Sequence, residues 1–75
     1  MSDIKRSVRI AGHRTSVSLE PEFWEALGAI AAARGLSLNA LIAEIDAGRG
    51  TQAGAANLSR VLRLHVLSYY RSKSP

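Results

Sequence analysis

The feature that most limits how this chain can fold is a change of sequence pattern within residues 14–37. In the first six of these residues, polar side chains alternate with the apolar or β-branched side chains of Thr15, Val17 and Leu19. This period of two predicts a strand with one buried face. Pro21 then suits the first turn of a helix, because its missing N–H has no partner to bond there. The pattern therefore predicts a short strand that passes directly into a helix.

The residues after Pro21 repeat with a helical period. The predicted buried stripe of a helix from Pro21 to Arg34 consists of Phe23, Leu27, Ile30 and Ala31, with Trp24 and Ala26 beside it. Gly35 is typical of the residue that ends a helix, and Ser37 is typical of a cap that begins one. We predict a second helix from Ser37 to about Ala47. Its buried stripe consists of Leu38, Leu41, Ile42 and Ile45.

Two further segments flank these elements. Residues 7–10 also alternate, but in the opposite phase to the strand that follows, so residues 11–13 form either a bulge in one long strand or the turn of a hairpin. The sequence leaves both alternatives open. Near the other end, Asn57 is a candidate cap for a third helix over residues 58–71. Its apolar side contains Leu58, Val61, Leu62, His65, Val66 and Tyr69, and its opposite side contains Arg60, Arg63 and Arg71.

A short strand, then Pro-Glu-Phe-Trp opening a helix, then the turn Gly35-Leu36-Ser37 before a second helix, resembles the ribbon-helix-helix family of bacterial and phage repressors. The resemblance covers about residues 14–47. It implies a mostly helical fold with a short N-terminal strand, assembled as an intertwined homodimer with a two-stranded antiparallel intermolecular ribbon. We expect a basic N-terminal arm or extra strand (1–13), a ribbon-helix-helix core (14–47), a Gly/Ala-rich loop (48–56), and a third amphipathic helix and tail (57–75).

Chain length also favours self-association. With 75 residues and no cysteine, the chain is one small domain without a disulfide framework. A lone strand also needs a second strand to satisfy its backbone N–H and C=O groups. We therefore expect an obligate homodimer in which the strand is completed by its twin.

The distribution of charge favours an anionic partner. The chain has a net charge of +4, and its basic residues concentrate in residues 1–14 and 58–75, whereas the middle is net acidic. No apolar run approaches the roughly 18 residues of a membrane span, and no signal peptide is recognisable. We expect a cytoplasmic protein that binds double-stranded DNA, with no membrane and no small-molecule substrate.

The resemblance assigns DNA contacts position by position. A ribbon of two strands enters the DNA major groove, so the groove-facing side chains, and the expected base contacts, are Arg14, Ser16 and Ser18. The expected phosphate contacts are Ser37, Leu38 and Asn39 at the start of the second helix, together with Lys5, Arg6, Arg9 and His13.

Other function classes find less support. His13 and His65 lie in different elements, with no cysteine and no carboxylates at a ligand spacing, so we expect no catalytic, metal or cofactor site. The expected function is transcriptional regulation. The alternative is a protein interaction module, or an antitoxin-like dimer, whose C-terminal helix binds a protein partner.

Overall fold

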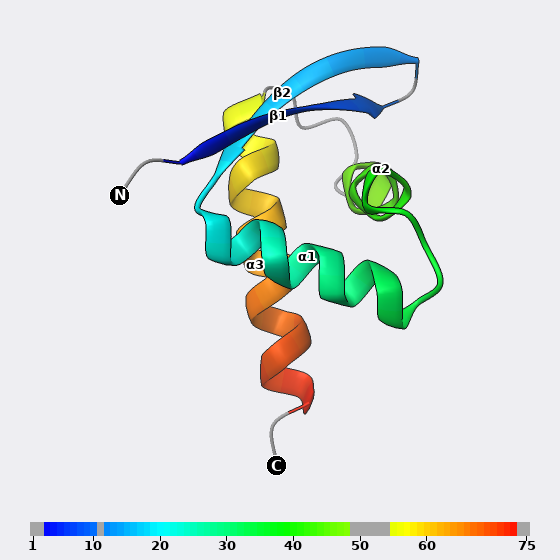
Figure 1. Cartoon of the computed structure of the whole chain (residues 1–75), viewed down its shortest axis with the longest axis vertical. Helices are drawn as coiled ribbons and strands as arrows, with labels where there is room; N and C mark the ends of the chain where they lie inside the picture. The colour runs from blue at the N-terminus through cyan, green and yellow to red at the C-terminus, as the bar shows by residue number, and fades with distance from the viewer. Residues whose placement is uncertain (1–2, 11, 49–54, 74–75) are drawn as a thin grey trace.

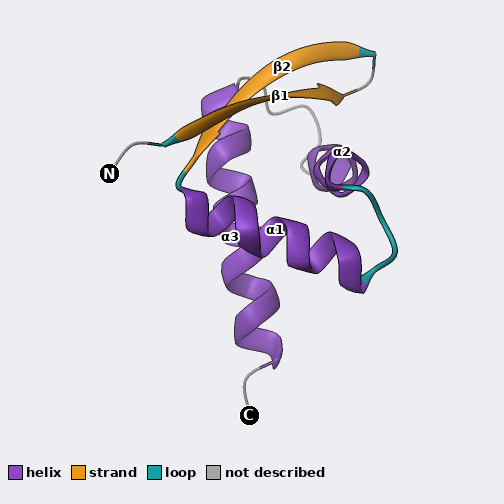
Figure 2. Ribbon diagram, viewed as in Figure 1, coloured by secondary structure: helices purple, strands orange, loops and turns teal. Residues whose placement is uncertain are grey.

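The computed structural model describes residues 3–10, 12–48 and 55–73. A two-stranded hairpin lies over three helices (Figures 1 and 2). The elements in chain order are β1 (Ile4–Ile10), β2 (His13–Leu19), α1 (Pro21–Ala33), α2 (Leu38–Gly48) and α3 (Ala55–Lys73). The fold is mostly helical, as predicted, and β2 passes into α1 at Pro21.

The hairpin resolves the alternatives that the sequence left open for residues 11–13. β1 and β2 pair antiparallel, with Ile4 opposite Leu19 and Ile10 opposite His13, and Gly12 in the connection has φ +80°. A hairpin explains the opposite phases, because this register places even-numbered residues of β1 on the same face as odd-numbered residues of β2. The expectation that the chain does not itself supply a partner for β2 is therefore wrong.

The core lies between the hairpin and the helices. Its buried side chains are Val8, Val17, Leu19, Trp24, Leu27, Ile30, Ala31, Leu41, Ile42, Ile45, Leu58, Leu62 and Val66. Trp24, predicted beside the stripe of α1, is only 4% exposed, whereas Phe23 and Leu38, predicted within the stripes, are half-buried. The indole N–H of Trp24 donates to the carbonyl oxygen of Ile4 at 2.8 Å, so its polar atom is satisfied against β1.

The turn between α1 and α2 follows the chemistry of its residues. Gly35 adopts φ +72°, and the N–H groups of Gly35 and Leu36 donate to the carbonyl oxygens of Ala32 and Ala31. This is the double hydrogen bond of a Schellman ending, which favours glycine at the left-handed position. Ser37 then caps α2, since its Oγ accepts from the N–H of Ala40 at 3.0 Å.

The third helix differs from its prediction at both ends. It begins at Ala55 and ends at Lys73, so Asn57 lies within its first turn and is not its cap. Most of the predicted loop, residues 49–54, lies outside the described residues, and Gly48 belongs to α2. No single described helix is long and apolar enough to cross a membrane; only α1 and α2 taken together pass that test, across a 95° bend.

The described part of one chain encloses its own core. Leu58, Leu62 and Val66 of α3 pack into it, and α3 lies against β2 while α2 lies against β1. Ser59 of α3 also donates its hydroxyl to the carbonyl oxygen of Ser18 at 3.2 Å. The third helix therefore buries its apolar side within its own chain.

Candidate nucleic-acid interface

The outer face of the hairpin, on the side opposite the helices, carries only polar side chains. The register places six residues on this face: Lys5, Ser7 and Arg9 from β1, and Arg14, Ser16 and Ser18 from β2. All are exposed except Ser18, which is half-buried. The predicted base contacts thus lie together, and β1 adds a second row beside them. The sequence predicted a basic arm or an extra strand for residues 1–13 and did not single out Ser7, although the opposite phases of residues 7–10 and 14–19 were the signal for it.

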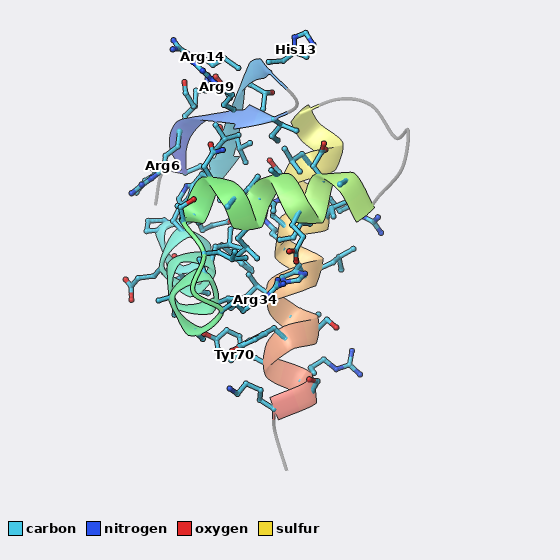
Figure 3. All side chains as sticks on the ribbon, turned by 90° about the vertical axis from the view of Figure 1, so that its right-hand side faces the viewer. Arg6, Arg9, His13, Arg14, Arg34 and Tyr70 are labelled. Carbon is cyan, nitrogen blue, oxygen red and sulfur yellow. The ribbon has the colours of Figure 1, made fainter. Side chains whose placement is uncertain are left out.

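Two arginines face each other near the tip of the hairpin. Arg9 pairs with Arg14 across the strands, and Figure 3 shows both at the end of the molecule above the helices. Both backbone polar groups of Arg9 bond to Asn39, outside the sheet, so this is a non-hydrogen-bonded pair, the kind with the closest side chains. Like charges directly opposite are destabilising. No ion pair of Lys5, Arg9 or Arg14 occurs among the described residues.

The start of α2 lies beside this face, and one of its three predicted phosphate contacts, Asn39, bonds to the hairpin. The amide of Asn39 is taken by the backbone of Arg9: its Oδ1 accepts from the Arg9 N–H and its Nδ2 donates to the Arg9 carbonyl oxygen, each at 2.8 Å. The Asn39 side chain is therefore already bonded within the fold. Ser37 is exposed and Leu38 is half-buried next to it. The Ser37 hydroxyl accepts from Ala40 and keeps its own proton to donate.

The structure separates two other predicted contacts from the outer face. Arg6 belongs to the helix-facing set of β1, and its guanidinium carbon lies 5.3 Å from the centroid of the Trp24 ring. Figure 3 shows it pointing away from Arg9 and Arg14. His13 is exposed at the start of β2, at the hairpin tip.

Two arginines on the helices have acidic partners. Arg63 contacts Glu20 at 3.0 Å and Asp3 at 4.0 Å, and Arg34 contacts Glu44 at 2.6 Å. A backbone hydrogen bond, and then the bond from Arg63, lower the pKa of Glu20. The bond from Arg34 lowers the pKa of Glu44, and the same contact raises the pKa of Arg34.

The described residues contain no group of three or more histidine and carboxylate side chains that could hold a metal ion. His13 and His65, the two histidines of the sequence, belong to β2 and α3. The outer face of the hairpin is the strongest candidate site because it places Lys5, Arg9 and Arg14 together on one exposed polar surface, which has the chemistry of an anion-binding surface.

Comparison with known proteins identifies the family. A family model described as a ribbon-helix-helix domain matches residues 3–70, which includes both strands and most of α3. No curated protein and no solved structure gives a match. The family match confirms the resemblance drawn from the strand-to-helix junction and the Gly35 turn, and extends it from residues 14–47 to residues 3–70. The chain belongs to the ribbon-helix-helix family.

Proposed function

We propose that this protein is a homodimeric transcriptional regulator that binds double-stranded DNA through the outer face of its hairpin. The observation that carries the proposal is the Arg9–Arg14 pair, two cations held side by side on an all-polar face without an acidic partner among the described residues. A polyanion relieves that repulsion. Ribbon-helix-helix proteins generally bind DNA, as regulators or antitoxins, and are typically not enzymes.

The free edge of β2 supports a dimer. Since the Arg9–Arg14 pair is non-hydrogen-bonded, the N–H and C=O groups of Arg14, and of Ser16 two residues on, point away from β1. Among the described residues, only the Ser18 carbonyl on this edge has a partner outside the strand, Ser59. An unpaired edge is a template for another strand. A second copy pairing there gives a four-stranded sheet in the order β1-β2-β2-β1.

The width of such a sheet determines which residues can contact DNA bases and which can contact phosphates. Strands lie about 4.8 Å apart, so the two outer strands are about 14 Å apart. The major groove is about 12 Å wide. The central β2 strands therefore enter the groove, and the flanking β1 strands lie over its phosphate walls. This arrangement gives base contacts to Arg14, Ser16 and Ser18, and phosphate contacts to Lys5 and Arg9.

The remaining contacts follow from the same placement. Arg14 can bond guanine O6 and N7 through its guanidinium, while the short serines bond less selectively. The Ser37 hydroxyl and the backbone N–H of Leu38, at the positive end of the α2 dipole, face the phosphate beside β1. His13 at the tip is a further phosphate contact. Arg6 is placed over Trp24 and is not part of this proposed surface.

The test is a titration of labelled duplex DNA at two salt concentrations with wild type, Arg14→Ala and Arg71→Ala. The Arg71→Ala variant removes the same charge from an exposed residue near the end of α3, remote from the hairpin. We expect Arg14→Ala to lose about 1–3 kcal/mol of discrimination at one base pair. Equal, salt-insensitive binding by all three proteins would contradict the proposal.

A second candidate function rests on the outward side of α3. Leu64 and Leu67 are 46% and 51% exposed there, and they line an open groove with Arg71. Residues 55–73 contain no acidic side chain. This surface suits a protein partner with an acidic amphipathic segment, as in an interaction module or an antitoxin-like dimer.

Recovery of partners from lysate separates the two candidates. Tagged wild type and a Leu64→Ser, Leu67→Ser variant are compared with and without nuclease. Partners that survive nuclease and disappear with the leucine substitutions support the interaction module. Material that disappears with nuclease, and is unaffected by the substitutions, supports DNA binding as the main function.

A further inference from the structure

Asn39 occupies a position where a neighbouring strand would lie. It is the second residue of α2, and its planar amide meets β1 at the edge that faces away from β2. Both of its hydrogen bonds, at 2.8 Å, go to the two backbone groups of one residue, Arg9, thirty positions away in sequence. A strand neighbour makes the same paired bond, N–H to oxygen and carbonyl to N–H, with a residue of this kind.

We infer that Asn39 acts as a one-residue substitute for a third strand. Its hydrogen bonds to Arg9 have two consequences. It closes the outer edge of β1 near the hairpin tip, which leaves β2 as the edge open to a second copy. It also fixes the backbone of Arg9 against the start of α2, so that the Arg9 side chain stands beside Arg14 on the outer face. Asn39 is thus a positioning residue, and not the phosphate contact that the resemblance implied.

The chemistry of the position supports a specific role for the amide. Bonding both an N–H and a C=O requires one acceptor and one donor on the same planar group, which asparagine supplies and aspartate does not. The cap of α2 is Ser37, so Asn39 is not needed to begin the helix. Ser37→Ala therefore offers a matched control that weakens α2 and leaves the bonds to Arg9 in place.

The first measurement is amide hydrogen exchange in the wild-type protein, which needs no DNA. Arg9, Ser7 and Lys5 all direct their N–H groups to the outer edge of β1, and only Arg9 has a described partner there. We expect the Arg9 amide to exchange at least about tenfold more slowly than those of Ser7 and Lys5, since exchange follows local opening. Equal exchange at the three amides would overturn the inference, whatever the protein binds.

The second measurement rests on the proposed function and uses duplex titration. Asn39→Ala and Asn39→Asp are expected to weaken DNA binding about tenfold, which is the scale of one or two net hydrogen bonds. We also expect the plot of log K against log salt concentration to become less steep, by about the contribution of one phosphate contact. Arg71→Ala, which changes an exposed residue near the end of α3, should keep the wild-type affinity and the wild-type dependence on salt. In an Arg9→Ala background, Asn39→Ala should have almost no further effect, because it acts through Arg9. An undiminished effect in that background would refute the role in placing Arg9.

The third measurement is the mass of the protein by light scattering over a range of concentrations. With its amide removed, β1 presents an open edge, so Asn39→Ala should form species larger than wild type and Ser37→Ala do. Identical masses for all three proteins would refute the closing of the edge. If wild type binds no DNA, the exchange and mass measurements still decide this inference, so its failure is distinguishable from failure of the proposed function.

Discussion

The two faces of the hairpin differ in what they do with their side chains. On the helix-facing side, Val8, Val17 and Leu19 are buried in the core, and the one cation, Arg6, lies over Trp24. Among the paired residues of the two strands, the outer side has no apolar residue. An antiparallel sheet commonly has one wet face, but a merely wet face does not need like charges opposite each other. The difference indicates that one face stabilises the fold and the other is available for binding.

Two of the cations on the helices are neutralised within the fold. Arg34 and Arg63 have carboxylate partners, whereas Arg60, Arg71 and Lys73 of α3 have none among the described residues. Lys5, Arg9 and Arg14 have none among the described residues. A surface evolved only for solubility mixes its signs. The outer face keeps its positive charge unneutralised, which is what attraction of a phosphate backbone requires.

The largest expected effect is on the helix-facing side. Leu19 is fully buried, so Leu19→Ala should lower the free energy of unfolding by about 2–5 kcal/mol. Ser16, nearby on the outer face, is exposed, and Ser16→Ala should change it by less than about 0.5 kcal/mol. Chemical denaturation of both variants measures this difference. Similar losses for the two would mean that the faces are not divided as described.

The next largest effect is that of Arg14→Ala, which should weaken DNA binding without lowering the free energy of unfolding. Arg14→Ala should weaken DNA binding by about 1–3 kcal/mol. The same change removes a like charge facing Arg9, so the free energy of unfolding should stay equal or rise by up to about 1 kcal/mol. Duplex titration and denaturation of one preparation measure both quantities. A variant that loses stability and binding together would show that Arg14 is structural.

Much of this fold could be predicted from local signals. Pro21 and Gly35 mark the two ends of α1 because each has backbone requirements that few other residues meet. The buried stripe of α2 followed from spacing alone, apart from Leu38. The burial of Trp24 was underestimated because a helical wheel gives the direction of a side chain and not its length. The large indole extends to β1, where its N–H donates to the Ile4 carbonyl oxygen.

The candidate site was less accessible to such reasoning. Arg14, Ser16 and Ser18 follow from the alternation of one strand, but their neighbours depend on the register with β1, which the sequence did not decide. Arg6 and Arg9 looked equivalent in an arm, but both lie in β1, where the alternation of side chains puts them on opposite faces. The bond between Asn39 and Arg9 joins residues thirty positions apart and leaves no periodic signal.

A smaller effect compares two neighbouring cations on opposite faces. Lys5→Ala should reduce DNA affinity by the same factor for all sequences. It should also make the plot of log K against log salt concentration less steep, by about the contribution of one phosphate contact. Arg6→Ala removes the same charge but should leave the slope closer to wild type, because Arg6 lies over Trp24. Its loss should instead alter tryptophan fluorescence and cost about 0.5–1 kcal/mol of stability. Equal slopes for the two variants would count against the assignment of faces.

The smallest effect concerns acid stability on the helical side. The bond from Arg34 lowers the pKa of Glu44 below its usual value of 4.5 in the folded state. The ionised carboxylate therefore stabilises the fold above pH 4.5, and this contribution is lost as the pH falls through the lowered pKa. The pair is exposed, so the stabilisation is small. Arg34→Ala should return the pKa of Glu44 towards its usual value.

The measurement is an NMR titration of the Glu44 side chain, with Arg71→Ala as the control, since it removes a charge outside the pair. If Arg34→Ala leaves the titration unchanged, Arg34 does not neutralise Glu44 in solution. The contrast between paired cations on the helical side and unpaired cations on the hairpin would then lose one of its two arginines. The DNA affinity of Arg34→Ala should stay at the wild-type level, because a cation already held by a carboxylate has little to offer a phosphate.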